Sequence, residues 1–296
     1  MSNSKAIICQ RLSKDYGEGH GLFELNLEIA EGEVFGLIGP NGAGKSTFIK
    51  LLMDLIKPSS GSASIFNLDS QKNSLELKKV IGYLPGELMQ FPSVTAGYIL
   101  NLLLNMRGVK DREYVKELAE KLQLDLDRKF QELSHGNKQK VGIIQAFMHR
   151  PKLLILDEPT LGLDPIIQRE LRGMIQEFRA AGNTVILSSH VLSEVESVCS
   201  RIGLIHEGRI IKEGTLDELR TSRIHKVSLI INGNLPTQNE IESVGGSEFE
   251  IEKNQIRFEI RGSIDAVIKV LSKYEILEID SRELSLEEVF FSEVKS

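Results

Sequence analysis

The segment that most constrains this chain is a glycine-rich run near its start. Its residues, in order, are Gly39, Pro40, Asn41, Gly42, Ala43, Gly44, Lys45, Ser46 and Thr47. Two glycines enclose four residues and are followed by lysine and serine, which fits the phosphate-loop pattern. Apolar residues at 34–38 predict a buried strand before the run. Apolar residues at helical spacing over 47–55 predict a helix after it.

A phosphate chain needs bare backbone N–H groups at a helix N-terminus, where the helix dipole also favours negative charge. Glycines let the backbone approach the phosphates closely because they carry no Cβ. We expect Lys45 to reach the β- and γ-phosphates and the Ser46 hydroxyl to ligate Mg²⁺. The alternative is a glycine-rich turn that happens to precede a lysine, and the register of strand, loop and helix disfavours it. The run therefore predicts binding and hydrolysis of a nucleoside triphosphate.

Composition limits the setting in which the chain works. Its 296 residues allow one large or two ordinary domains, and a net charge of −6 implies no general attraction to nucleic acid. The cysteines, Cys9 and Cys199, form no disulfide framework, so a reducing cytoplasm is the simplest setting. The polar start predicts no signal peptide, and no segment offers the ~20 apolar residues of a membrane helix. We expect any membrane role to come through a partner.

The first 220 or so residues alternate β-rich and helical stretches, which is typical of a mostly parallel sheet wrapped by helices. Unbroken apolar runs at 153–156, 184–187 and 202–205 predict strands buried on both faces. Residues 96–106 and 114–124 predict two helices with no strand between them. That pair indicates a helical insertion in an α/β core.

After residue 221 the pattern changes to an expected strand, helix, strand, strand, helix and strand. These elements are expected at residues 226–231, 238–244, 249–252, 256–260, 263–274 and 276–279. This order is the ferredoxin-like split pattern. We therefore expect a first domain at residues 1–221 and a small α+β domain at 222–296.

Two acidic residues, Asp157 and Glu158, follow directly on an expected buried strand. An aspartate at such a point can hold Mg²⁺ through a water, and a neighbouring glutamate can accept a proton from water that attacks the γ-phosphate. Surface carboxylates at strand ends are common, so this pair alone is weak support for catalysis.

A second potential anion site lies at 133–137, ahead of a helix expected over 138–148, where Ser134 and Gly136 precede a helix N-terminus. An ordinary serine N-cap is the more usual use of such a residue. Further on come the segment 162–164, Gly-Leu-Asp, and His190 at the end of an expected strand. A lone histidine there is usually structural.

Taken in order, these motifs resemble the ATP-binding subunits of ABC transporters over about residues 5–220. The resemblance implies an α/β P-loop NTPase core of the ABC ATPase type, with a helical subdomain at about 93–145. The element pattern after residue 221 adds the expected ferredoxin-like α+β C-terminal domain. The resemblance also implies that Tyr16 stacks on adenine, as physics also expects of an exposed ring. It further implies that Asp157 assists Mg²⁺, Glu158 acts as general base and His190 contacts the γ-phosphate.

The same resemblance implies a dimer of two copies facing head to tail. Asp164 would lie at the subunit interface, and Ser134, Gly136 and Asn137 would contact ATP bound to the second copy. ATP binding would then close the dimer and hydrolysis would let it open, which is a two-state element biased by a ligand.

The chain departs from the family pattern at two places. The family usually has a glutamine after a Tyr-x-Pro stretch, and Gly86 occupies that position here. We expect the neighbouring Glu87 to substitute as a Mg²⁺ ligand, since a carboxylate also suits that ion. In the second anion-binding segment, His135 replaces a glycine and Asn137 replaces the usual glutamine.

The C-terminal stretch 285–290 resembles the ending of ATPase subunits in drug-, antibiotic- and lipid-exporting systems of the daunorubicin-resistance type. It also has the spacing of a short amphipathic helix. The resemblance implies an exporter whose membrane permease is encoded separately. The insertion at 93–130, with Phe91 and Tyr98, would grip that permease and hold the chain on the inner face of the cell membrane.

Two other kinds of protein carry the same phosphate loop: a non-transport ABC protein, and a GTPase or small-molecule kinase. A non-transport ABC protein that acts on ribosomes or nucleic acid usually joins two cassettes or inserts a coiled coil, whereas this chain has one cassette and net negative charge. A GTPase needs an Asn-Lys-x-Asp motif. Residues 137–140 begin like one but lack the aspartate.

Overall fold

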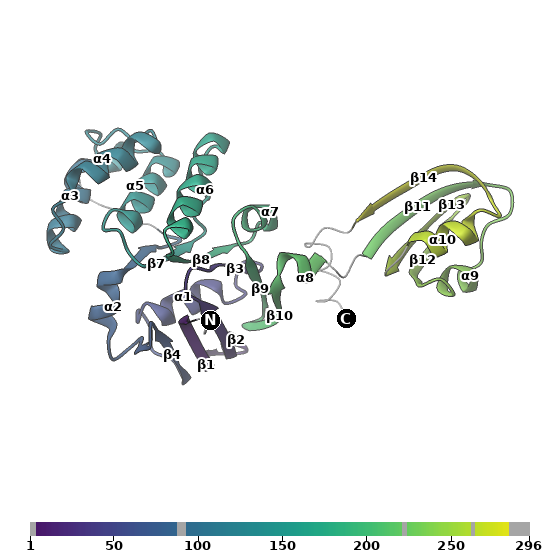
Figure 1. The fold of residues 1–296 in the computed structure, drawn as a ribbon, viewed down its shortest axis with the longest axis horizontal. Coiled ribbons are helices and arrows are strands. Elements are labelled where there is room, and N and C mark those ends of the chain that lie inside the picture. The colour runs from purple at the N-terminus through teal and green to yellow at the C-terminus, as the bar shows by residue number, and fades with distance from the viewer. Residues whose placement is uncertain (1–3, 88–92, 221–223, 262–263, 284–296) are drawn as a thin grey trace. The chain divides into compact units, whose positions relative to one another are not determined.

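The computed structural model describes residues 4–87, 93–220, 224–261 and 264–283. By their internal contacts the residues fall into two compact units, 1–215 and 216–296. Each unit has its own β-sheet structure and its own hydrophobic core (Figure 1). Within the described ranges, no helix is long and apolar enough to cross a membrane.

A six-stranded sheet forms the centre of the first unit, in the order β10-β9-β3-β8-β7-β6. The neighbours from β9 to β6 run parallel, and β10 pairs antiparallel with β9. The strands are β3 (Val34–Ile38), β6 (Ile81–Leu84), β7 (Leu153–Asp157), β8 (Thr184–Ser189), β9 (Arg201–His206) and β10 (Arg209–Thr215). Strands β3, β7 and β8 are buried along their whole length, as expected where both faces of a sheet are covered. The buried strands predicted at 34–38, 153–156, 184–187 and 202–205 are confirmed as β3, β7, β8 and β9.

A second sheet of four antiparallel strands, β2-β1-β4-β5, completes the β-structure of this unit. Its strands are β1 (Lys5–Gly17), β2 (His20–Ala30), β4 (Ser60–Ile65) and β5 (Leu68–Asp69). The sequence pattern did not predict this sheet. Several register shifts interrupt the pairing of β1 with β2, and such bulges break the strict alternation by which a half-buried strand is recognised.

The helices of the first unit differ from expectation at both their starts and their ends. They are α1 (Lys45–Leu52), α2 (Ser74–Val80), α3 (Ala96–Met106), α4 (Arg112–Lys121), α5 (His135–Phe147), α6 (Pro165–Ala180) and α7 (Leu192–Glu196), with a 3-10 turn at Phe130–Glu132. The prediction for 96–106 is confirmed. Helix α5 begins at His135, three residues before the predicted start, because the Ser134 side chain caps it. Helix α1 begins at Lys45 rather than Thr47 and ends at Leu52 rather than at residue 55. Helix α4 spans Arg112–Lys121 rather than 114–124.

Helix α1 lies between the two sheets, where it fixes the loop that precedes it (Figure 1). Phe48 and Ile49 of this helix share one buried core with Leu25 of the antiparallel sheet and Ile155 of the parallel sheet. Burying apolar side chains on both sides of a helix stabilises its position in two directions. The glycine-rich run at the N-terminus of α1 is therefore held on a rigid support.

The second unit is a four-stranded antiparallel sheet, β12-β13-β11-β14, with helices packed on its apolar face. Its elements are α8 (Leu216–Arg220), β11 (Ile224–Asn232), α9 (Gln238–Glu242), β12 (Gly246–Glu252), β13 (Gln255–Arg261), α10 (Ile264–Leu271) and β14 (Glu275–Glu283). From β11 onward the predicted ferredoxin-like order is confirmed. Strand β14 extends beyond the predicted 276–279, and helix α10 is shorter than the predicted 263–274.

Candidate active site

The glycine-rich run connects β3 to α1, so its backbone N–H groups lie at the start of a helix. Gly44 is the N-cap of α1 with φ of 109° and makes no side-chain cap, which leaves the first N–H groups of the helix open to an anion. Gly42 has φ of 82°, a region that favours glycine. A Cβ at Gly39 would lie 2.2 Å from the Ile205 carbonyl oxygen, so only glycine fits there.

Lys45 is the first residue of α1, and its side chain is buried beneath the loop. Its ammonium donates hydrogen bonds to the carbonyl oxygens of Gly39 at 2.6 Å and Pro40 at 3.2 Å. It also forms an ion pair with Glu158 Oε1 at 3.3 Å. The lysine is therefore anchored to both the phosphate loop and the acidic pair.

Asp157 and Glu158 lie at the carboxyl end of β7, as the sequence predicts. Asp157 is buried, and its Oδ1 accepts a hydrogen bond of 2.5 Å from the Ser188 hydroxyl on the adjacent strand β8. Glu158 has φ of 50°, a left-handed conformation that L side chains rarely adopt. Its N–H is held by the carbonyl and the hydroxyl oxygen of Ser188, each at 3.2 Å.

His190 follows β8 and lies beside Glu158, with Nδ1 2.8 Å from Glu158 Oε2. Strands β7 and β8 are parallel neighbours, so their carboxyl ends place these side chains at one edge of the sheet. Glu158 thus contacts Lys45 through one carboxylate oxygen and His190 through the other. The structure brings together three residues that are far apart in the sequence.

The electrostatic effect of Asp157 extends to Tyr83 on the neighbouring strand β6. Burial raises the pKa of Tyr83 to about 12, and the negative charge of Asp157 adds to the shift. The Tyr83 phenol therefore stays protonated and neutral at physiological pH.

Gly86 follows β6 and passes close to Asp157. A Cβ at this position would lie 3.2 Å from Asp157 Oδ2, so a larger residue would crowd the carboxylate. Glu87, the next residue, is exposed. Phe91, which the sequence associates with permease binding, lies outside the described residues.

The segment predicted as a second anion site is the N-terminus of α5. The Ser134 hydroxyl accepts a hydrogen bond from the Asn137 N–H at 3.3 Å, so the ordinary N-cap role is present. A Cβ at Gly136 would lie 2.4 Å from the Gly162 carbonyl oxygen, which shows how closely the two segments approach. Asp164 caps α6 by accepting from the N–H groups of Ile166 and Ile167.

Tyr16 lies near the end of β1 with its side chain exposed, and the Lys14 ammonium sits 5.4 Å from the centre of its ring. Sequence reasoning missed two residues that contact the acidic pair. They are Ser188, which binds Asp157 and Glu158, and Gln139, whose amide reaches the backbone after β7. The signal for Ser188 was its place two residues before His190, near the carboxyl end of β8.

Comparisons with known proteins agree with this geometry. A sequence family described as ABC transporter matches residues 22–161. The bacitracin transport ATP-binding protein BcrA of Enterococcus faecalis is 32% identical over 96% of this chain and 94% of its own length. The protein of the same name from Bacillus licheniformis is 38% identical over 71% of this chain and 69% of its own length. A lantibiotic transport ATP-binding protein, SrtF of Streptococcus pyogenes, is 40% identical over 70% of this chain and 90% of its own length.

Solved structures show the same fold. The ATP-binding subunit of an ABC transporter aligns with a TM-score of 0.68 and 32% identity, covering 73% of this chain and 92% of that one. An ATP-binding cassette in a dimeric, post-hydrolysis state bound to ADP and phosphate aligns with a TM-score of 0.63 and 27% identity. The alignment covers 71% of this chain and 98% of that one.

The parallel sheet, the phosphate loop and the Lys45–Glu158–His190 group define a P-loop ATPase. More particularly, the chain belongs to the ATP-binding subunits of ABC transporters. It binds and hydrolyses ATP as the ATPase subunit of an exporter, and action on ribosomes or nucleic acid is not favoured.

Proposed function

We propose that this chain drives export of an antibiotic through a separately encoded permease, working as an ATP-dependent dimer. The observation that carries the proposal is the full-length match to a bacitracin transport ATP-binding protein, which includes the second unit. Other relatives are named for lantibiotic transport and linearmycin resistance. Antibiotics are therefore the cargo class that the relatives favour.

The phosphate loop has the geometry for the triphosphate, with Gly39, Pro40, Asn41, Gly42, Ala43, Gly44, Lys45, Ser46 and Thr47 as its binding residues. Tyr16 offers an exposed ring to adenine. Glu158 acts as general base toward the attacking water, since its carboxylate lies beside the lysine that would face the phosphates. His190, in contact with the same carboxylate, orients the base and reaches the γ-phosphate.

Mg²⁺ fits the oxygen donors of this site. In the described parts of the chain, no three His, Cys, Asp or Glu side chains gather into a metal cage. Mg²⁺ does not need such a cage, since it is usually held by one or two carboxylates and the substrate phosphates. Ser46 and Asp157 supply the hydroxyl and carboxylate oxygens, and Glu87 is the third ligand proposed. The ion would neutralise charge on the β- and γ-phosphates.

A second copy completes the site with Ser134, Gly136 and Asn137, and Asp164 lies at the interface between copies. Exposed apolar side chains beside these residues support the contact. Ile166, next to the Asp164 cap, is 66% exposed, and Leu161 is also exposed. Apolar groups gathered beside a polar site commonly mark a surface that another protein covers.

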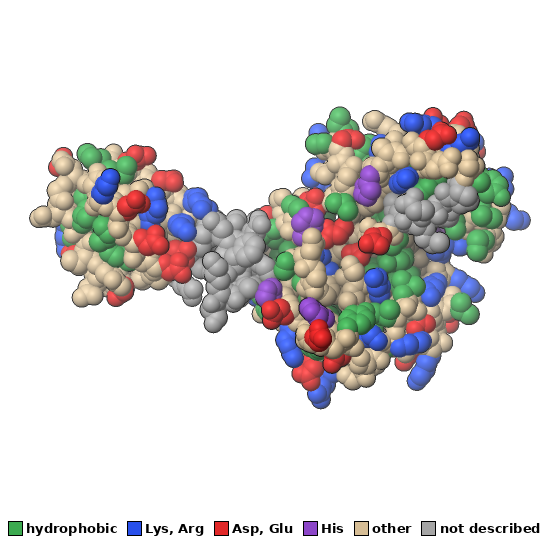
Figure 2. All heavy atoms as spheres, turned by 180° about the vertical axis from the view of Figure 1, so that it is seen from behind, with side chains coloured by type: hydrophobic (Ala, Val, Ile, Leu, Met, Phe, Trp, Pro, Cys, Tyr) green, Lys and Arg blue, Asp and Glu red, His purple; other side chains and the backbone are tan. Residues whose placement is uncertain are grey.

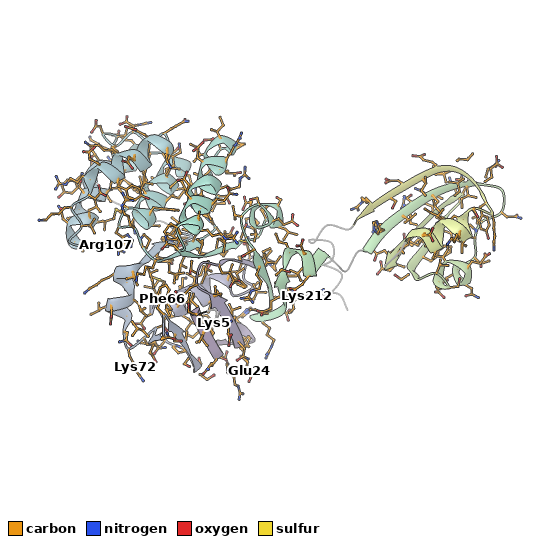
Figure 3. The ribbon with its side chains drawn as sticks, in the orientation of Figure 1. Lys5, Glu24, Phe66, Lys72, Arg107 and Lys212 are labelled. Carbon is orange, nitrogen blue, oxygen red and sulfur yellow. The ribbon has the colours of Figure 1, made fainter. Side chains whose placement is uncertain are left out.

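Helix α3 supplies the proposed permease contact. Tyr98, Leu102 and Met106 are exposed and recur every four residues, so they share one face of the helix. Arg107, labelled in Figure 3, ends this helix and donates a hydrogen bond to the Lys78 carbonyl. An apolar face of this kind suits a membrane protein that holds the chain at the inner membrane surface. Residues 285–290, the exporter-like ending, lie outside the described residues.

A nucleic-acid partner is not proposed. On the face drawn in Figure 2, acidic and basic side chains are intermixed over each unit rather than gathered into one basic patch. The net charge of −6 agrees with that distribution.

The proposal is tested in cells that carry this chain together with the membrane protein encoded next to it. We expect the pair to lower susceptibility to bacitracin or a lantibiotic, and the same pair with Glu158→Gln to give no protection. A fluorescent or tagged copy of the chain should reach the membrane only when the permease is present. Equal antibiotic susceptibility with and without the pair would contradict the cargo class.

A further inference from the structure

Gln139 is a buried side chain of the nucleotide-binding unit that the proposed mechanism does not yet use. It lies on α5, about one turn beyond the Ser134 cap, and is 1% exposed. Its amide Nε2 donates to the carbonyl oxygens of Glu158 at 3.2 Å and Pro159 at 3.4 Å. A buried amide that satisfies two main-chain carbonyls fixes the local path of the chain that carries them.

The segment that accepts these hydrogen bonds from Gln139 is the turn after β7, which orients the Glu158 side chain. This residue has a left-handed backbone, with φ of 50°, that a free chain would rarely keep. On the opposite side, Ser188 accepts the Glu158 N–H with both its carbonyl and its hydroxyl oxygen. The Glu158 peptide is therefore clamped between strand β8 and helix α5, while its carboxylate reaches Lys45 and His190.

The same helix begins at the segment proposed to face the second copy. Gly136, three residues before Gln139, approaches the Gly162 carbonyl so closely that a Cβ would lie 2.4 Å from it. Helix α5 thus touches the acidic turn through Gln139 and the Gly162–Asp164 segment through Gly136. A displacement of the α5 N-terminus would be transmitted to the main chain of Glu158 through the hydrogen bonds of Gln139.

We propose that Gln139 is a positioning residue for ATP hydrolysis, which holds the Glu158 turn in its reactive geometry and ties that turn to the helix that meets the second copy's triphosphate. The inference rests on the proposed role of Glu158 as general base. It predicts that loss of the amide slows turnover while ATP binding persists, because the Gln139 amide hydrogen-bonds to the Glu158–Pro159 main chain and not to the phosphate loop. A small error in the placement of a catalytic base is enough to cost much of the rate.

The test replaces the amide while keeping the length of the side chain. Gln139→Met removes both hydrogen bonds, and Gln139→Glu removes the donor but keeps the polarity and size. The control is Gln145→Met on the same helix. For each purified variant, the dissociation constant for ATP, kcat, KM and the melting temperature are measured. We expect both Gln139 variants to lose about tenfold or more in kcat, with the dissociation constant for ATP within about twofold of the parent and Gln145→Met near the parent rate.

Two outcomes would overturn the inference. One is a parent-like kcat in either folded Gln139 variant. The other is a loss of ATP affinity in proportion to the loss of kcat, which would indicate a general defect of the fold. If Gln139→Met fails to fold, Gln139→Glu decides the question. Measuring Glu158→Gln in parallel separates the two hypotheses, since an active Glu158→Gln would contradict the base itself, whatever Gln139 does.

Discussion

The ammonium of Lys45 lies 3.3 Å from Glu158 Oε1, so the phosphate-loop lysine and the residue proposed as general base form an ion pair with each other. Lys45 is buried, and Glu158 is half-buried. The γ-phosphate that the lysine is expected to meet would compete with Glu158 for the same ammonium. Engagement of Lys45 by the triphosphate would therefore release one carboxylate oxygen to accept a proton from water.

Glu158→Gln removes the proposed base and one half of this ion pair. We expect ATP hydrolysis to fall by about a hundredfold or more, because general-base catalysis contributes roughly 10²- to 10⁴-fold. ATP binding should persist, since the phosphate loop is unchanged and Lys45 loses its competitor. Steady-state phosphate release and equilibrium ATP binding measure the two effects. A matched control is Glu120→Gln on the exposed side of α4, and hydrolysis by Glu158→Gln at the parent rate would refute the assignment.

Lys45→Met should act on binding rather than on the base. The ammonium donates to Gly39 and Pro40 as well as pairing with Glu158, so its loss removes charge from the loop and leaves Glu158 without its cation. Hydrogen bonds to charged groups contribute about 1.5–3 kcal/mol each, so ATP affinity should fall by roughly ten- to a hundredfold. Lys50→Met, an exposed position on the same helix, is the control. Unchanged affinity in Lys45→Met would show that the triphosphate binds elsewhere.

Glu87→Ala tests whether this carboxylate replaces the glutamine that Gly86 lacks. We expect the Mg²⁺ concentration for half-maximal ATPase activity to rise several-fold, because one oxygen ligand is removed while Asp157 and Ser46 remain. Glu76→Ala, on helix α2, serves as the matched surface control. An unchanged Mg²⁺ requirement would remove Glu87 from the metal site and leave the exposed carboxylate as an ordinary surface group.

The two thiols should be inert in the folded chain. Burial raises the pKa of Cys9 to about 12, and burial raises the pKa of Cys199 still further, so little thiolate exists near neutral pH. A colourimetric thiol reagent should therefore label neither cysteine in the native protein and both after denaturation. Rapid labelling of either residue in the native state would mean that the segment around it, β1 for Cys9 or the α7–β9 connection for Cys199, opens locally.

Much of the fold could be predicted from local sequence, because the spacing of apolar residues and the placement of glycines within a short segment determine its secondary structure. The strand, loop and helix around Lys45 follow from an apolar run, glycines and helical spacing, and the helix at Ala96–Met106 follows from its apolar period. The antiparallel sheet built on β1 escaped prediction, since bulges in its pairing disturb the alternation of side chains. Within the site, motif order pointed to Glu158 and His190, and the structure places them in contact.

What the sequence could not predict were contacts between distant segments. Ser188 binds Asp157 from 31 residues away, and Gln139 reaches Glu158 from 19 residues away. Neither pair has a spacing that a helix or strand period would reveal, since only the packing of β8 and α5 around β7 brings them together. The left-handed backbone of Glu158 is likewise imposed by these tertiary hydrogen bonds rather than by its residue type.

We expect His149 to make the free energy of unfolding fall at acidic pH. This residue lies beyond the C-terminus of α5, where one ring nitrogen, Nε2, contacts the Ile81 carbonyl at 3.0 Å. The other, Nδ1, is buried and has no hydrogen-bond partner among the described residues. Burial, followed by the positive charge of Arg107, lowers the pKa of His149 from 6.5 to about 4. The folded state therefore holds the ring neutral, while the unfolded chain takes up a proton once the pH drops below the ordinary value.

Because the unfolded state binds the extra proton, His149 contributes stability that is fully present above about pH 6.5 and is lost as the pH falls toward about 4. The free energy of unfolding, measured by denaturant titration at a series of pH values, should fall across this window. In His149→Gln, which cannot be protonated and can still donate to Ile81, the fall should be shallower. His20→Gln, at an exposed position at the start of β2, is the control and should follow the parent. If His149→Gln lost stability as steeply as the parent, other groups would account for the acid sensitivity.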